Sequence, residues 1–213
     1  MKRTLREIES ELKKRVTFPY NWGQKQNDFF DKQTNFIYHT FLFDNLLREI
    51  EKRFKALPDY NLYFNYALNR WYNFWSAQAV ENIFCSLPGV TPALDSKNKL
   101  VDFSIQGVSF DHKTSVFPKK FPYQINDAIK KTGELILWLY KNQSQEQRKH
   151  FSNRLFVVLY KPDGEHWKLK SEINWLKDRI EKYMAGFNPA YLLKFSFDEN
   201  RETLSDVIWA IGE

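Results

Sequence analysis

The chain has 213 residues, of which 43% are hydrophobic and 17% aromatic. This content of core-forming residues excludes a disordered chain, and the length is sufficient for one domain with a substantial core. The formal net charge of +6 is compatible with a polyanionic partner such as nucleic acid. Net charge without clustering is weak support for such a partner.

Composition also limits the cellular setting. No apolar run reaches the roughly 18 residues that a membrane span needs, and the charged N-terminus is unlike a signal peptide. The single cysteine, Cys85, cannot form an internal disulfide and lacks the companions of a zinc cluster. We therefore expect a soluble, unexported protein of the cytoplasm with no membrane partner.

The first part of the chain has the hydrophobic spacing of helices. Apolar residues recur every three or four positions across 1–16, 28–55 and 61–86. Aromatic residues occupy most of the circumference of the third helix, which predicts burial on several sides. Within a single domain of 1–213, residues 1–60 are interpreted as a helical extension for dimerisation or substrate recognition, and 61–213 as the core.

Beyond a Leu87-Pro88-Gly89 breaker, short β-type segments appear and then alternate with helices. The predicted elements are strands at 90–94, 100–105 and 108–116, a helix at 122–142, a strand at 155–160, a helix at 171–185, a strand at 191–197 and a short tail at 204–211. The continuous apolar run of 155–160 is typical of a central strand covered on both faces. The order predicts an α/β fold with a mixed sheet flanked by helices.

The most informative stretch is 101–113, where Gln106-Gly107 separates two β-type runs. A two-residue turn there pairs Phe103 with Phe110 and Asp102 with Asp111. Side chains alternate along strands, so one face is apolar. The opposite face is predicted to carry Asp102, Ser104, Ser109, Asp111 and Lys113.

Two carboxylates directly opposite each other repel, and a divalent cation would compensate their charge. Mg²⁺ takes carboxylate oxygens while keeping waters and a substrate phosphate in its shell. Lys113, on the same face, could hold or deprotonate an attacking water. The other interpretation is a solvated face in which Asp102 or Asp111 pairs with Lys113. The second acid in register favours the metal site.

The sequence Asp102, eight residues, then Asp111-His112-Lys113 resembles the signature of the PD-(D/E)xK nuclease superfamily, also called restriction-endonuclease-like. The resemblance covers about 75–160 and continues over 171–197, with Val101 where the signature has Pro. It implies a core of a helix, a three-strand meander, a helix and a further strand. It also implies a Mg²⁺- or Mn²⁺-dependent deoxyribonuclease that hydrolyses DNA phosphodiester bonds, such as a restriction-like or DNA-processing endonuclease.

The resemblance implies a role for each of these residues. Asp102 and Asp111 would be metal ligands, and Lys113 the catalytic lysine. Glu81 lies on the helix from which the superfamily often supplies a further metal-binding Glu, although the exposed edge of a helix is the alternative. His112 should face the apolar side as a core histidine.

Residues after the hairpin are further candidates. Gln124 and Lys131 are seven apart on the predicted helix and so share a face; with Lys119 and Lys120 they could contact nucleic acid, and a solvated charged surface is the equal alternative. No glycine-rich phosphate loop or dinucleotide fingerprint is present, so no nucleotide cofactor is expected. The alternative function is a non-catalytic nucleic-acid-binding or assembly module on a nuclease scaffold.

Overall fold

The computed structural model describes residues 3–94, 100–142, 151–198 and 201–213. It divides into two compact units. Unit 1 is Met1–Ala79 with Lys170–Asn174, and unit 2 is Val80–Leu169 with Trp175–Glu213. The boundary at Ala79 and Val80 lies inside the helix Tyr60–Cys85. The sequence had placed the end of the helical extension earlier, near residue 60. No helix in the described ranges is both long and apolar enough to cross a membrane.

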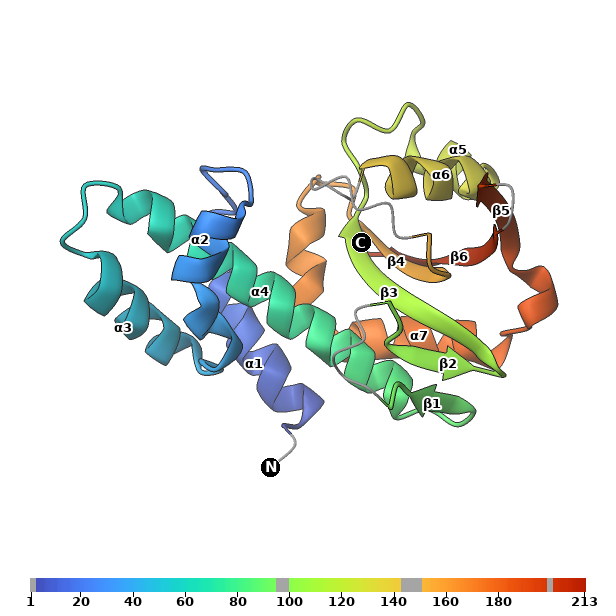
Figure 1. The fold of residues 1–213 in the computed structure, drawn as a ribbon, viewed down its shortest axis with the longest axis horizontal. Helices are drawn as coiled ribbons and strands as arrows, with labels where there is room; N and C mark the ends of the chain where they lie inside the picture. Colours follow the sequence, from blue (N-terminus) through green and yellow to red (C-terminus); the bar gives the residue numbers. More distant parts are fainter. Residues whose placement is uncertain (1–2, 95–99, 143–150, 199–200) are drawn as a thin grey trace. The chain divides into compact units, whose positions relative to one another are not determined.

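Unit 1 is helical (Figure 1). Its elements are α1 (Leu5–Arg15), α2 (Asp28–Gln33), the 3-10 helix η1 (Asn35–Tyr38), α3 (Phe43–Phe54) and most of α4 (Tyr60–Cys85). A capping box starts α1, because Thr4 Oγ1 accepts from the Glu7 amide while the Glu7 carboxylate accepts from the Thr4 amide. The aromatic helix α4 is buried as predicted, with Tyr66, Trp71 and Tyr72 fully covered.

One predicted helix is divided in the structure. The pattern over 28–55 predicted a continuous helix, which was wrong: the chain leaves α-helical geometry at Thr34 and resumes it only at Phe43. Thr34 Oγ1 donates to Phe30 O, and Trp71 Nε1 donates to Thr40 O at 2.7 Å. Side chains that bond backbone oxygens offer an alternative to the helical ladder, which hydrophobic spacing does not reveal.

Unit 2 contains a six-stranded mixed sheet in the order β1-β2-β3-β4-β6-β5. Its strands are β1 (Val90–Pro92), β2 (Phe103–Ile105), β3 (Val108–Val116), β4 (Arg154–Tyr160), β5 (Leu193–Asp198) and β6 (Arg201–Ile211). The first three form an antiparallel meander, β3, β4 and β6 run parallel, and β5 pairs antiparallel with β6. The predicted α/β class, a mixed sheet flanked by helices, is confirmed.

Helices cover both faces of this sheet. Figure 1 shows α5 (Ile125–Lys130) and α6 (Thr132–Asn142) on one face and α7 (Ile173–Ala185) on the other. The 3-10 helices η2 (His166–Ser171) and η3 (Pro189–Tyr191) flank α7 in the chain. Phe156 and Val158 of β4 belong to the core under α6, and alternation turns Leu155 and Val157 to the opposite face, where they are fully buried. The central position predicted for this strand is confirmed.

The C-terminal segment differs from the prediction. The stretch 204–211, interpreted as a short tail, is the greater part of β6, which lies between β4 and β5. Ser205 Oγ donates to Arg154 O, and the Asp206 carboxylate accepts from the Tyr183 hydroxyl. Polar residues in this stretch argued against a buried strand in the sequence. Their hydrogen-bond partners are distant in sequence, so the pattern of the stretch did not reveal them.

Candidate active site

The hairpin of β2 and β3 has the predicted turn and register. Gln106 and Gly107 have φ angles of 48° and 84°, which is the backbone of a type I′ turn and matches strand twist. Phe103 pairs with Phe110, and the Ser104 and Ser109 hydroxyls are 2.9 Å apart. The turn therefore fixes which residues of β3 face each side.

The predicted cross-strand pair of Asp102 with Asp111 is not part of the ladder, which ends at Phe103 and Phe110. Asp102 lies before β2, at a bend, and its amide donates to Phe110 O. Its Oδ2 instead accepts from the His112 amide at 2.8 Å and lies 2.6 Å from His112 Nδ1. The β2–β3 ladder ends before His112, so the amide of His112 has no backbone partner on β2. The side chain of Asp102 supplies that partner.

The environment of Asp102 favours its ionised form. Burial acts to raise its pKa, but the hydrogen bonds from His112 and the charge of Lys113 outweigh burial, so the pKa of Asp102 is lowered from 3.8. Within the described residues no partner is bonded to its second oxygen, Oδ1, and the side chain is 24% exposed. This oxygen is therefore open to a ligand.

His112 occupies the apolar face, as predicted for a core histidine. Its ring lies 6.0 Å from the Phe103 ring and 6.2 Å from that of Phe84, and Phe84 and Phe103 stack at 4.6 Å. Phe84 belongs to the last turn of α4. The histidine thus joins the aromatic core to the carboxylate of Asp102.

Asp111 is the most enclosed of the predicted site residues, with a side chain 4% exposed. Its Oδ1 lies 2.7 Å from Lys113 Nζ, and its Oδ2 accepts from Arg154 Nε at 3.1 Å. The pairing that the sequence offered as an alternative, an acid bound to Lys113, is thus present. An incoming cation would have to replace one of these two groups, and Lys113, 43% exposed, is the freer one.

Arg154 is the site residue that sequence reasoning missed. It begins β4, in parallel register with Asp111, and so faces α6 together with Phe156. An arginine directly before an apolar strand was the only signal, and such a residue is usually a solvated strand end. Its proximity to Asp111 follows from strand pairing between segments that lie far apart in the chain.

Glu81 is half-buried on α4, three residues before Phe84. Residues at this spacing lie on neighbouring parts of one helix face, so Glu81 is on the side from which α4 meets the hairpin. The structure does not join Glu81, Asp102 and Asp111 into a metal cluster: within the described ranges no group of three or more His, Cys, Asp or Glu side chains could hold an ion.

The weaker candidates lie around α5. Gln124 is the exposed N-cap of α5 and makes no capping bond through its side chain. The helix ends at Lys130, so the prediction that Gln124 and Lys131 share the face of one continuous helix was wrong. Lys131 Nζ lies 3.8 Å from the Tyr123 ring centroid, and Lys119 and Lys120 are exposed.

The donor set fits a divalent ion that keeps much of its water shell. Mg²⁺ binds proteins through one or two carboxylates together with water and phosphate, and does not require an all-protein cage. The open Oδ1 of Asp102 and the Oδ1 of Asp111, once Lys113 moves, are donors of this kind. A site that needs three acidic ligands is not formed by the described residues.

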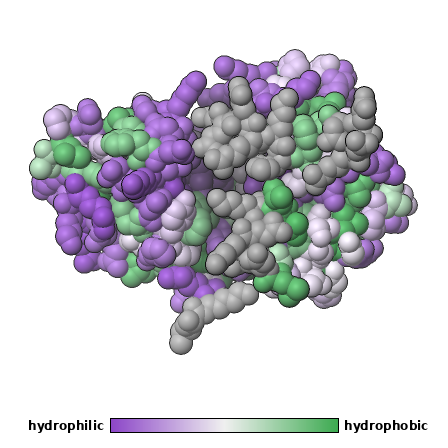
Figure 2. Space-filling model, in the orientation of Figure 1, coloured by the Kyte–Doolittle hydropathy of each residue, from purple (hydrophilic) through white to green (hydrophobic). Residues whose placement is uncertain are grey.

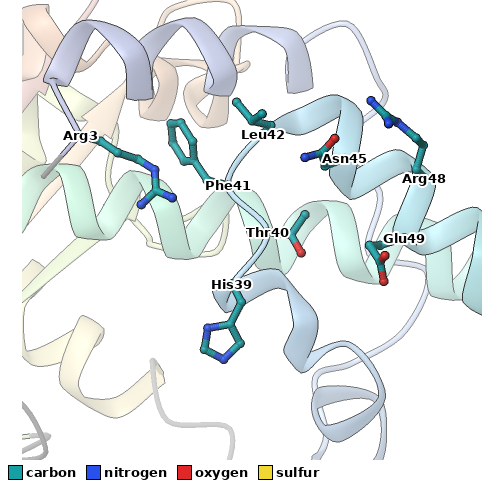
Figure 3. A pocket seen from close by; sticks show the side chains of 8 residues that line it. All are labelled: Arg3, His39, Thr40, Phe41, Leu42, Asn45, Arg48 and Glu49. Atoms are coloured by element: carbon teal, nitrogen blue, oxygen red, sulfur yellow. The ribbon is translucent and has the colours of Figure 1, made fainter. Parts of the chain in front are cut away.

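A hollow in unit 1 has none of the predicted site residues in its lining. It measures about 470 Å³ and is lined by Arg3, which precedes α1, by the segment before α3, including Phe41, and by α3 itself, including Arg48 (Figure 3). Figure 2 shows a face with many hydrophilic residues and with separate hydrophobic areas over each of the two units. Neither feature adds to the candidate site.

Comparison of the chain with protein-family models, with curated proteins and with solved structures finds no match.

Proposed function

We propose that this chain is a divalent-ion-dependent nuclease that hydrolyses DNA phosphodiester bonds, with a restriction-endonuclease-like core of the PD-(D/E)xK type. One observation carries the proposal: Lys113 Nζ lies 2.7 Å from the Asp111 carboxylate, and the charge of Lys113 also lowers the pKa of Asp102. The Lys113 amine thus acts on both acids of the hairpin region.

The order of elements supports this proposal. Helix α4, the meander β1-β2-β3, the helices α5 and α6, and the strand β4 follow one another in the chain, which is the order that the resemblance implies. The hairpin with the acids lies within the meander, and β4 runs parallel beside it.

In this proposal Asp102 and Asp111 hold the ion through carboxylate oxygens, and His112 fixes the orientation of Asp102. Bound Mg²⁺ or Mn²⁺ supplies positive charge beside the phosphate and lowers the pKa of water. Lys113, released from Asp111 Oδ1, positions the attacking water at the phosphorus. Glu81 is a candidate for orienting water at the same site.

The proposal is tested by cleavage of linear, circular, branched and single-stranded DNA with Mg²⁺ and Mn²⁺. Lys113→Ala is expected to lower the cleavage rate by about 10²–10⁴-fold. Because Lys113 is 43% exposed, this change should leave the fold intact. Lys177→Ala is the matched control, since Lys177 is 39% exposed on α7 and should be dispensable. Equal cleavage by Lys113→Ala and the parent would refute the assigned role.

A non-catalytic nucleic-acid-binding or assembly module is the second candidate. The observation that favours it is the enclosure of Asp111, whose two oxygens are each bonded to a cation. Calorimetry separates the two functions. A module of this kind should bind DNA in EDTA, take up no Mg²⁺ and leave the DNA intact, whereas a nuclease should take up the ion and cut.

A further inference from the structure

Arg154 is held in place by two different contacts. Its Nε donates to Asp111 Oδ2 at 3.1 Å, and its Cζ lies 5.0 Å from the ring centroid of Tyr140 on α6. Tyr140 is itself fixed, because its hydroxyl donates to Ser152 O at 2.8 Å. The guanidinium group is therefore oriented before any ligand arrives.

The contact with Asp111 uses only part of this guanidinium. Arginine carries five N–H donors in a planar fork, and four of them belong to the two Nη nitrogens. Within the described residues no hydrogen-bond acceptor is bonded to either Nη, and neither is fully enclosed without a partner. The edge that suits a bidentate oxyanion is thus available.

The charges around Asp111 agree with this arrangement. The buried carboxylate of Asp111 lies beside two cations, Lys113 and Arg154. The side chain of Arg154 is 11% exposed, which leaves it reachable while its surroundings strengthen any charge-assisted bond.

We propose that Arg154 binds the DNA phosphate at the cleavage site through its Nη edge, while Nε keeps hold of Asp111. The inference depends on the proposed nuclease function and adds a substrate contact to it. The planar fork, and not charge alone, is the feature that matters, because a lysine at this position would offer a point charge.

The test measures DNA binding by the full chain as a function of salt. A fluorescent duplex is titrated in EDTA with the parent, Arg154→Gln and Arg154→Lys. Arg154→Gln is expected to weaken binding about tenfold and to reduce the slope of log K against log [salt] by about 0.9, the value for one lost phosphate contact. Lys177→Gln, on α7, should leave the slope unchanged.

Arg154→Lys controls for loss of folding, because it keeps a cation beside Asp111 and should fold even if Arg154→Gln does not. It should retain the parent salt slope yet cut saturating DNA at least about tenfold more slowly, because it lacks the fork. An unchanged slope in Arg154→Gln, or parent cleavage by Arg154→Lys, would overturn the inference alone. A parent chain that neither binds nor cuts DNA would overturn the nuclease proposal as well.

Discussion

Buried arginines serve different ends in the two units. In unit 1, Arg15 is fully buried, and its two Nη nitrogens donate to three neutral oxygens of the same unit: Phe18 O, Pro19 O and Asn69 Oδ1. In unit 2, Arg154 gives one donor to an acid and keeps its Nη edge open within the described residues. A guanidinium whose Nη nitrogens bond neutral oxygens of its own unit stabilises a fold, whereas one with an open Nη edge beside an acid is suited to a ligand.

Arg70 is also held by partners within unit 1, and its Nε forms an ion pair with Asp31 Oδ1 at 3.2 Å. Its guanidinium donates to Asp31 O, Thr34 Oγ1 and Tyr38 Oη at 2.5–2.6 Å, all within unit 1. Burial lowers the pKa of Arg15, although the hydroxyls of Tyr72 and Tyr20 oppose this effect. These arginines donate hydrogen bonds to oxygens that the helices shield from water. Their removal should therefore lower the free energy of unfolding.

The largest expected effect is on stability in unit 1. Arg15→Met keeps the length of the side chain but leaves the buried Asn69 Oδ1 and two part-buried carbonyl oxygens without their donor, and should lower the free energy of unfolding by about 3 kcal/mol. Urea denaturation measures this value. Arg53→Met, at an exposed arginine on α3, is the control and should stay within about 0.5 kcal/mol of the parent.

Arg154→Met should be less costly, at about 1–2 kcal/mol, because Lys113 still neutralises Asp111. Adding Asp111→Leu should recover part of the loss, since replacing both partners of a buried pair by apolar groups is often neutral. The same denaturation series reads both variants. If Arg154→Met costs as much as Arg15→Met, the contrast between the two arginines fails.

A third change probes the turn that aligns Asp111. Gly107 has a φ of 84° and open space around the position of a Cβ, so Gly107→Ala should cost about 1 kcal/mol from backbone conformation alone. Gly186→Ala is the matched control, because its φ lies outside the left-handed region and its nearest neighbour is 3.9 Å away. Equal stability of the two variants in thermal melting would contradict a turn held by positive φ.

The smallest expected effect concerns two aspartates of unit 2, Asp206 and Asp102, whose contributions to the free energy of unfolding should change with pH in opposite directions. Burial raises the pKa of Asp206 above 3.8 despite bonds from the Val207 amide and the Tyr183 hydroxyl. Its contribution to stability is full below 3.8 and is lost as pH rises through the folded pKa. The lowered pKa of Asp102 gives the reverse: its contribution is full above 3.8 and is lost as pH falls through the folded pKa.

Unfolding free energies measured on both sides of this pH separate the two aspartates. Asp206 makes the free energy of unfolding fall as pH rises, and Asp206→Asn should reduce that fall. Asp102 makes the free energy of unfolding increase as pH rises, and Asp102→Asn should reduce that increase. In Asp206→Asn the single amide oxygen can still accept from the Val207 amide, and the new NH2 group can donate to the Tyr183 hydroxyl oxygen, so the change should be tolerated. The same slope in both variants would show that His112 does not hold Asp102 as described.

Local pattern was sufficient for much of unit 2. The alternation around Gln106-Gly107 predicted the register of β2 and β3, placed Lys113 beside Asp111 and turned His112 to the core. The apolar run of β4 predicted a strand covered on both faces. These features follow from strand geometry, in which successive side chains point to opposite sides and a two-residue turn fixes the pairing.

Other features depend on contacts between distant segments. Asp102 leaves the predicted pair because the His112 amide, open at the end of the ladder, is a better partner than a second acid. β6 is central only because β4 and β5 lie on either side of it. Arg154 reaches Asp111 through parallel pairing of β3 with β4. Periodicity along a chain fixes the faces of an element, while the neighbours that each face meets are set by packing of the whole unit.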